Sequence, residues 1–252
     1  MTGVAALAAL TGTASAATEA QGTEAGYQAM TADIGASVQT VTASWIEPKV
    51  IPRGKQDEYA SLFAGFDNSD DTGLAPPCCS GAPGSAQVGT EADSIGGRAR
   101  YYAWYSPANG GFGRVDIKKS VRPGDHMSAS VTAGGSVGLN DTLKLTDVRY
   151  RARQKPLTWT VVIRTGNSYN LNQAQGAVFG LASPPLATGG NSLLADVGTV
   201  RFTDVTVNGH VIGSYKPNLD QYELFGICAP IAISSSLGRG GNNFTVTWRA
   251  TR

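Results

Sequence analysis

The chain has 252 residues, and 20 Lys and Arg residues nearly balance 19 Asp and Glu residues, for a net charge of +1. Nucleic-acid-binding proteins usually carry a clustered basic excess, so this balance predicts that nucleic acid is not a partner. The chain holds only two histidines and three cysteines, and none has metal-ligand spacing. We therefore expect neither a metal site nor a cofactor.

The N-terminal stretch has the character of a secretion signal. Residues 1–17, MTGVAALAALTGTASAA, contain a short apolar run that ends in Ala-Ser-Ala, as signal peptidase requires, although no basic residue precedes the run. The run is too short to span a bilayer as a helix. The sequence therefore predicts a signal peptide over 1–17, an extended lead-in over 18–25, and a secreted, extracellular protein without a membrane segment.

Export would allow a disulfide bond. Cys78 and Cys79 are adjacent, and the distance of about 3.8 Å between neighbouring Cα atoms lies below the usual disulfide range of roughly 4.4 to 6.8 Å. A bond from Cys228 to one of them is therefore favoured, and the other thiol would stay free. The sequence leaves open which of the two is bonded.

From Gly26 onward, short strand-like runs alternate with turn signals, and no helical period lasts over three turns. The runs that predict strands are 38–45, 60–66, 85–92, 98–105, 115–121, 127–133, 142–150, 157–163, 177–181, 197–207 and 244–249. This pattern predicts an all-β fold, an antiparallel two-sheet β-sandwich of jelly-roll or concanavalin-like type. We expect one domain over 26–252, and a monomer.

Residues 85–105, SAQVGTEADSIGGRARYYAWY, contain the most informative pair of strands. Gln87, Gly89 and Glu91 share one face of the first strand because side chains alternate. The second strand is rich in aromatic residues, and Ser94 to Gly97 predict a hairpin loop between the two. An amide and a carboxylate beside aromatic rings predict a polar floor in an aromatic groove. The alternative is a solvated strand face.

Other polar features favour simpler interpretations. The tract from Asp67 to Asp71 could form a calcium loop, but a polar turn with self-bonding Asp and Asn side chains explains it better. His126 and His210 fall at predicted turns, so neither is favoured as a catalytic base.

Six stretches match a known pattern in order along the chain. They are Gly26-Tyr27 with VQTVTASWIEP at 38–48 ("SGY … SVSASWTVP"), FAGFD at 63–67 ("FWVGLDG"), QVGTEAD at 87–93 ("QIGTEAD"), YYAWY at 101–105 ("YYAWYE"), PGD at 123–125 with SASVT at 128–132 ("AGDSMSASVT"), and ADVGTV at 195–200 ("ADFGTV"). Together they resemble the glutamic peptidases, secreted acid endopeptidases with a two-sheet β-sandwich, and especially their actinobacterial branch.

The resemblance implies a reaction. A glutamate acts as general base on a water that attacks the peptide carbonyl, and a glutamine amide orients the water and stabilises the oxyanion. The glutamine corresponds to Gln87. A polypeptide substrate and an acidic pH optimum are implied, and we expect Asp67, Tyr101, Trp104 and Tyr105 to contact the substrate.

The glutamate of the family has no counterpart in this sequence. Its strand reads roughly "AEVIAEAP", and anchoring the match on Pro184 puts Ala182 at the base position, whereas a slide toward Ala174 puts Phe179 there. No Glu occurs between Glu91 and Glu223.

Two further positions in the same region also differ from the family. Its Glu after "AWY" is Ser106 here, and the Trp of its "NWSGY" opening aligns with Glu24.

Three hypotheses remain. The first is an active peptidase with a relocated base, for which Glu91 is the main candidate, since alternate residues of a strand point the same way at about 6.5 to 7 Å per step. Asp67 and Glu24 are the other candidates. The second is a catalytically inactive homologue that binds peptide or glycan in the same groove. The third is a purely structural sandwich.

Overall fold

The computed structural model describes residues 24–67, 86–106, 115–134, 140–148, 157–164, 176–184, 192–215, 220–225 and 230–249. In these ranges nearly all regular structure is β, with one four-residue helix α1 (Thr31–Ile34) and one 3-10 turn (Ile212–Tyr215). The expected signal peptide, the three cysteines and the tract after Asp67 lie outside the described residues.

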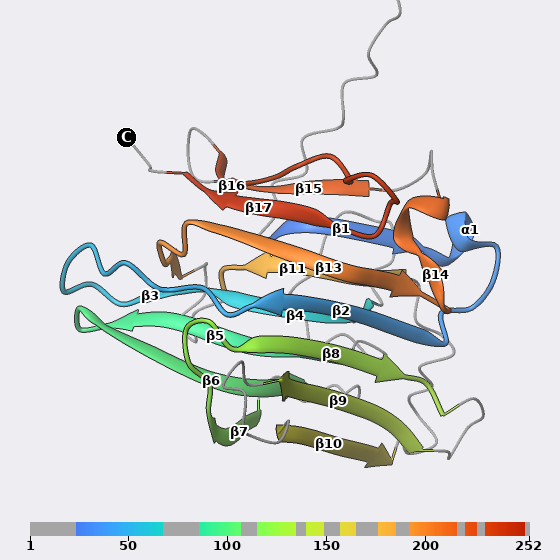
Figure 1. Ribbon diagram of the computed structural model, residues 1–252, viewed down its shortest axis with the longest axis horizontal. Helices are drawn as coiled ribbons and strands as arrows, with labels where there is room; N and C mark the ends of the chain where they lie inside the picture. Colours follow the sequence, from blue (N-terminus) through green and yellow to red (C-terminus); the bar gives the residue numbers. More distant parts are fainter. Residues whose placement is uncertain are drawn as a thin grey trace, which may run out of the picture.

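Two antiparallel sheets form the sandwich (Figure 1). Sheet A runs in the order β10 (Leu157–Arg164), β9 (Asn140–Val148), β8 (His126–Thr132), β2 (Thr40–Ile46), β13 (Thr199–Val207), β17 (Phe244–Trp248) and β16 (Pro230–Ser234). Sheet B runs in the order β7 (Val115–Ser120), β6 (Arg98–Ser106), β5 (Ala86–Ile95), β4 (Ser61–Asp67), β11 (Gly176–Ala182), β1 (Glu24–Met30) and β15 (Asp220–Phe225). The predicted antiparallel two-sheet β-sandwich is therefore confirmed.

Short strands complete the two sheets. Strand β15 pairs with both β1 and β16, so it joins the sheets at one edge. The two-residue strands are β3 (Glu58–Tyr59), its parallel partner β12 (Leu193–Leu194), and β14 (His210–Val211).

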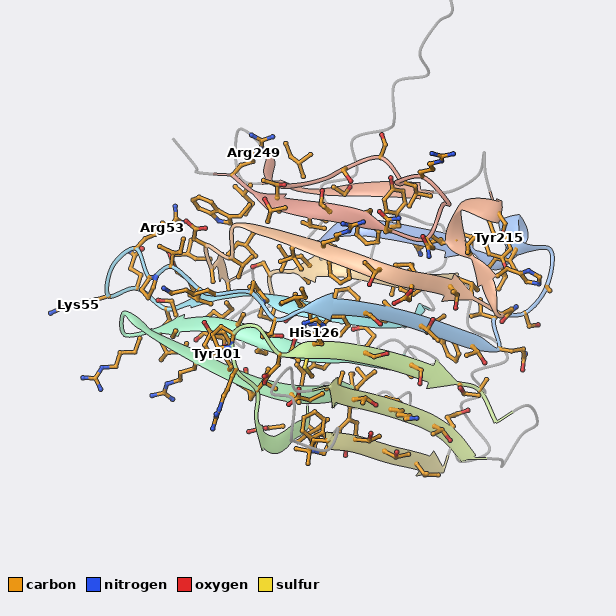
Figure 2. The ribbon with its side chains drawn as sticks, viewed as in Figure 1. Arg53, Lys55, Tyr101, His126, Tyr215 and Arg249 are labelled. Atoms are coloured by element: carbon orange, nitrogen blue, oxygen red, sulfur yellow. The ribbon has the colours of Figure 1, made fainter. Side chains whose placement is uncertain are left out.

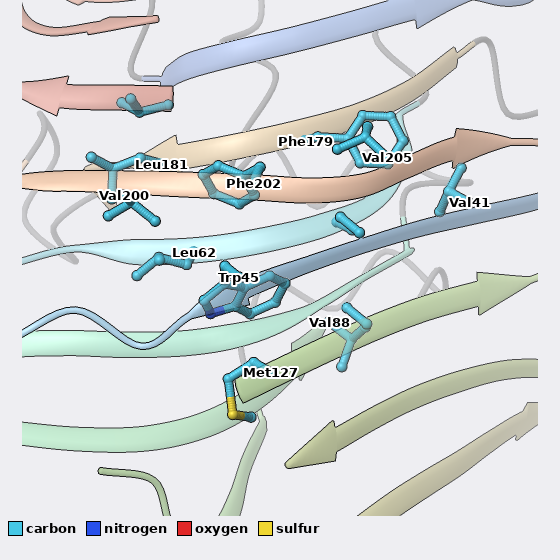
Figure 3. Close-up of a cluster of buried hydrophobic side chains, with 14 of the residues drawn as sticks. Val41, Trp45, Leu62, Val88, Met127, Phe179, Leu181, Val200, Phe202 and Val205 are labelled. Carbon is cyan, nitrogen blue, oxygen red and sulfur yellow. The ribbon is translucent and has the colours of Figure 1, made fainter. Parts of the chain in front are cut away.

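The main core lies between the sheets (Figure 3). Trp45 and Phe202 project from sheet A with ring centroids 5.9 Å apart, and they meet Leu62, Val88 and Phe179 of sheet B. All five side chains are at most 2% exposed. Burial of apolar side chains on this scale is the main stabilising term of a sandwich, since each fully buried one contributes about 1.5 to 3 kcal/mol.

Several boundaries differ from the sequence-based expectations. The predicted lead-in runs into β1, which begins at Glu24, and the strands at 220–225 and 230–234 were not predicted because their apolar runs are short. The hairpin between β5 and β6 is tighter than expected. Its turn is Gly96-Gly97 alone, both with positive φ, as a two-residue hairpin requires.

Sheet B is buried on both faces at its centre. Every residue of β1 and of β11 is buried, and so are those of β5 up to Ser94. On the face turned away from sheet A, a second apolar cluster consists of Phe63, Trp104, Val178 and Ala182. We call this side of sheet B its outward face.

Glycines bring the strands of sheet B together. A Cβ on Gly26 or Gly180, which pair across β1 and β11, would press on a backbone carbonyl of the opposite strand, Phe179 in one case and Ala25 in the other. Because neither strand has a side chain at this point, the two backbones can approach each other closely. Close approach, and not an unusual φ, is therefore the reason for glycine at both positions.

Gly180→Ala should destabilise the protein by about 1 to 3 kcal/mol because its methyl group would meet the Ala25 carbonyl and lie 3.1 Å from the Gly26 Cα. The urea-unfolding midpoint measures this change. The matched control is Gly54→Ala, whose new Cβ has no neighbour within 4 Å and should change stability by less than about 0.5 kcal/mol. Equal midpoints for the two variants would contradict close packing between β1 and β11.

Candidate functional site

Strand β5 presents different chemistry on its two faces. Val88 and Ala92 belong to the core between the sheets, so the alternate residues Gln87 and Glu91 lie on the outward face. Thr90 points toward sheet A, where it accepts a hydrogen bond from the Trp45 indole at 3.1 Å. The predicted sharing of one face by Gln87 and Glu91 is therefore confirmed at the level of strand alternation.

Strand register fixes the neighbours of Gln87. It pairs with Ser106 of β6 on one side and with Gly65 of β4 on the other. Gly65 pairs in turn with Val178 of β11, and Val178 with Gln28 of β1. Gln28 pairs in turn with Asp220 of β15. The row through Gln87 on the outward face thus runs Ser106, Gln87, Gly65, Val178, Gln28, Asp220. Val178 and Gln28 were not identified from the sequence, because cross-strand register is not visible there.

The side chain of Gln87 lies across Gly65. A Cβ built on Gly65 would stand 2.5 Å from the Gln87 Cγ and 2.8 Å from its Cα. Only glycine at position 65 leaves the amide this space. Gln87 itself is 5% exposed. Its amide therefore lies on the outward face of sheet B but is largely covered, and not in a groove open to solvent.

Glu91 occupies a different row. It pairs with Tyr102 on β6 and Ser61 on β4, and the Ser61 hydroxyl donates a hydrogen bond to its carboxylate. Both Ser61 and Glu91 are 0% exposed. Glu91 stands two alternation steps from Gln87, with Gly89 between, which is about 13 Å along the strand. A single water cannot bridge that distance, which weighs against Glu91 as the relocated base.

Phe179 and Ala182, the two positions that the motif match gave for the missing base, also lie away from Gln87. Phe179 points into the core between the sheets, where Figure 3 shows it near Val205. Ala182 is on the outward face, but it pairs with Ser61 and Glu24 and so belongs to the row of Glu91. The residue of β11 in the row of Gln87 is Val178, four residues before Ala182.

Glu24 lies at the end of the Glu91 row. It is 2% exposed, and its Oε1 has no hydrogen-bond partner among the residues described. Two further strands, β11 and β4, separate it from β5. It is therefore too far from Gln87 to share a water with it.

The aromatic residues of β6 divide between the faces. Trp104 lies on the outward face, fully buried, with its ring centroid 6.4 Å from that of Phe63. Tyr101 and Tyr105 pack against the core between the sheets, and the Tyr101 hydroxyl accepts the Val50 N–H at 2.9 Å. Of the three aromatic residues expected to line one groove, only Trp104 shares the face of Gln87.

Asp67 is described by its place in the strand. It ends β4, two residues beyond Gly65, and pairs with Gly176. Since Gly65 is the partner of Gln87, position 67 is the nearest acidic position to Gln87 by register in the part of sheet B that the structure describes.

A buried carboxyl lies behind β5, between the sheets. Glu47 is 1% exposed and accepts hydrogen bonds from the Thr90 hydroxyl at 2.6 Å and the Trp45 indole at 3.3 Å. Burial raises the pKa of Glu47 to about 8, and the nearby carboxyls of Asp125 and Asp93 add to the rise. Nothing in the sequence pattern identified Glu47.

Asp93, one row beyond Glu91 on β5, is a second buried carboxyl with a raised pKa. It is 1% exposed, accepts the Ala60 N–H at 3.3 Å, and burial raises its pKa to about 7. The pKa of the Tyr102 hydroxyl is raised by burial and by Asp93. Both groups are therefore neutral in acid.

Within the described ranges, no group of three or more His, Cys, Asp or Glu side chains is placed to hold a metal ion. The same ranges contain no helix with the length and apolar character needed to cross a bilayer.

Comparison with known proteins gives a consistent result. The sequence model of the Peptidase A4 family matches residues 22–218. Scytalido-glutamic peptidase, solved with a transition-state analogue inhibitor, is similar with a TM-score of 0.63 and 18% identity, over 90% of this chain and 98% of that one. SCP-B, a member of the eqolisin family solved with the tripeptide Ala-Ile-His, gives 0.61 and 18% over the same shares.

Aspergilloglutamic peptidase from Aspergillus niger is also similar, with a TM-score of 0.53 and 19% identity over 76% of this chain and 99% of that one. No curated protein matches the chain. At these identities the structural likeness shows a common fold.

The Glu47 proton should make stability depend on pH. The folded chain keeps this proton up to about pH 8, whereas an ordinary glutamate loses it near 4.5. The free energy of unfolding should therefore fall as pH rises from about 4.5 to about 8, by up to about 1.4 kcal/mol per pH unit for this group. Glu47→Gln should reduce the slope, most clearly between pH 7 and 8, since the proton of buried Asp93 contributes a fall of its own up to about pH 7.

Urea unfolding at several pH values checks this expectation. Asp57→Asn, which removes an exposed carboxylate, serves as the control and should keep the slope of the parent protein. A parent protein that is equally stable at pH 5 and pH 8 would show that Glu47 does not hold its proton.

Proposed function

The chain belongs to the Peptidase A4 family, the glutamic peptidases, and on this premise we propose that it is a secreted protein that binds polypeptide chains with Gln87 but hydrolyses them poorly. Membership confirms the resemblance drawn from the sequence motifs. The observation that carries the proposal is the row of Gln87, in which an amide faces an apolar side chain, Val178, across Gly65.

Gln87 supports polypeptide binding. Its amide can donate to a peptide carbonyl and accept from a peptide N–H, and Gly65 leaves it room to do so. Gln28 lies in the same row but is 2% exposed and has an interaction of its own, so the proposal uses Gln87 alone.

The same row accounts for poor hydrolysis. A general base must lie within hydrogen-bond reach of the attacking water, and its loss typically reduces the rate by about 10² to 10⁴. From Ser106 to Gln28 no residue of the row carries a carboxylate, and Asp220, which pairs with Gln28 at the β15 end, lies four strands or about 19 Å from Gln87. Glu91 is about 13 Å from Gln87 along β5, and its carboxylate accepts a hydrogen bond from Ser61.

A second candidate is an active glutamic-type acid endopeptidase in which Asp67 acts as base. The register of β4 favours it, because position 67 follows Gly65 by two residues. In this version Gln87 orients the water and Asp67 removes its proton.

The apolar run ending in Ala-Ser-Ala over residues 1–17 supports a signal peptide and secretion in either case. We also propose that residues 26–252 form a single domain, to which the first two residues of β1, from Glu24, are added.

Gln87→Ala should weaken binding of a labelled casein peptide about 3- to 10-fold at pH 4, because one hydrogen bond is lost. Fluorescence anisotropy measures the affinity, and Gln56→Ala, at an exposed glutamine in a loop, is the control and should bind as the parent does. On denatured haemoglobin at pH 2 to 5 the pure parent protein should show little turnover. Efficient turnover that is lost in Asp67→Asn would favour the second candidate.

A gain of activity tests the row directly. Val178→Glu should place a carboxyl across Gly65 from the Gln87 amide and raise haemoglobin hydrolysis in acid at least about 10-fold, given the effect of a general base. The matched control is Ala182→Glu, which puts the same side chain in the row of Glu91 and should gain nothing. Val178→Gln controls for a buried polar group without acid-base chemistry.

Circular dichroism at pH 4 selects the folded variants for this comparison. Hydrolysis gained by Ala182→Glu and not by Val178→Glu would mean that the reacting carbonyl lies in the row of Glu91, and the assignment of Gln87 would be wrong.

A further inference from the structure

One end of the sandwich gathers exposed basic residues. The loop 51–57 and the β5–β6 hairpin both project there, at the left of Figure 1. They are packed together, since a Cβ on Gly97 would lie 2.7 Å from the Gly54 carbonyl, and the Gly96 N–H donates to Asp57 at 2.8 Å. The two segments therefore form one surface.

Four cationic side chains belong to this surface, which we call the basic tip: Arg53, Lys55, Arg98 and Arg100. All four residues are exposed, and Figure 2 shows Arg53 and Lys55 projecting from this end. The Arg53 guanidinium lies 4.2 Å from the centre of the Trp248 ring, which holds it in place.

The carboxyl groups at this end do not cancel the cations outside. Glu58 is 5% exposed and forms an ion pair with Arg53 at 3.4 Å. Asp57 is exposed and accepts the Gly96 N–H, a neutral donor that leaves its charge in place, so it offsets one of the cations. Asp93, opposite Arg100, is 1% exposed, and burial raises its pKa to about 7, so it carries little charge in acid. Below pH 7 the described residues of the basic tip therefore keep an excess of positive charge, carried by Lys55, Arg98 and Arg100.

The basic tip is continuous with the outward face of sheet B. Arg100 pairs with Asp93, which lies on the face of Gln87, three alternation steps farther along β5. The distance along the strand is about 20 Å, which an extended polypeptide covers in about six residues. The residues of β5 from Ala86 to Ser94 are buried, so a polypeptide that contacts Gln87 would cross this distance over the molecular surface and not on the strand itself to reach the basic tip.

We propose that the basic tip binds acidic residues of the polypeptide ligand, about six residues from the segment held by Gln87. This inference rests on the proposed function, since it assumes a polypeptide on the outward face. Guanidinium groups recognise carboxylates through paired hydrogen bonds, and Arg98 and Arg100 supply two on one strand. The ligand class would be polypeptides with acidic stretches.

The test uses two extended peptides that differ only in a terminal block, glutamates in one and glutamines in the other. At pH 6 the glutamates are ionised, since their ordinary pKa is about 4.3. We expect the acidic peptide to bind at least about 10-fold more tightly to the full chain at low salt. In the double variant Arg98→Glu, Arg100→Glu this preference should disappear.

The charge-matched control is the double variant Arg201→Glu, Arg239→Glu, two exposed arginines on β13 and in the turn before β17 with no part in the basic tip. It should keep the preference for the acidic peptide. An equal loss in the control would show that only overall charge matters and would overturn the proposal. Tighter binding of heparin than of the acidic peptide would overturn it in favour of an anionic polysaccharide.

The glutamine peptide separates this inference from the proposed function. If it binds through Gln87 and the glutamate peptide binds no better, the basic tip has no such role and the proposed function stands. If the glutamine peptide does not bind and the glutamate peptide does, the proposed function fails and the basic tip stands as a polypeptide-binding surface.

Discussion

Close backbone packing in sheet B is the constraint on which the rest of the structure depends. Gly26 and Gly180 let β1 and β11 lie flush, and Gly65 leaves β4 open under the Gln87 side chain. Without these glycines, each strand would be held away from the next by its Cβ atoms. Because the centre of the sheet is buried on both faces, its polar residues are held in fixed places and must find partners inside the protein.

Register then determines which chemistry is possible. The outward face has polar rows through Gln87, Glu91 and Asp93, and the buried Phe63 and Trp104 lie in the row between the first two. The first row holds the Gln87 amide, with its only described carboxyl position, Asp220, four strands away. The second row holds Glu91, which is engaged with Ser61, and Glu24 at its end. The proposal of poor hydrolysis rests on this separation of the amide from the carboxyl groups.

The sequence could predict some of this arrangement and not the rest. Alternation along β5 correctly gave Gln87 and Glu91 the same face, since side-chain direction is a local property of a strand. Which residue of β11 stands opposite Gln87 is set by pairing through β4, so the motif match pointed to Ala182 whereas the register gives Val178. The same limit hid the division of the β6 aromatic residues between the two faces.

The buried carboxyls make the fold sensitive to pH. Glu47 lies behind β5 and Asp93 on the outward face of β5, and burial favours their neutral forms because a charge in a poorly solvated interior is costly. In acid these groups need no counter-ion, and the exposed arginines of the basic tip stay charged. The same burial therefore leaves an excess of positive charge at that end of sheet B, with neutral carboxyls inside and guanidinium groups outside. The ligand preference that we propose for the basic tip would follow from this distribution of charge.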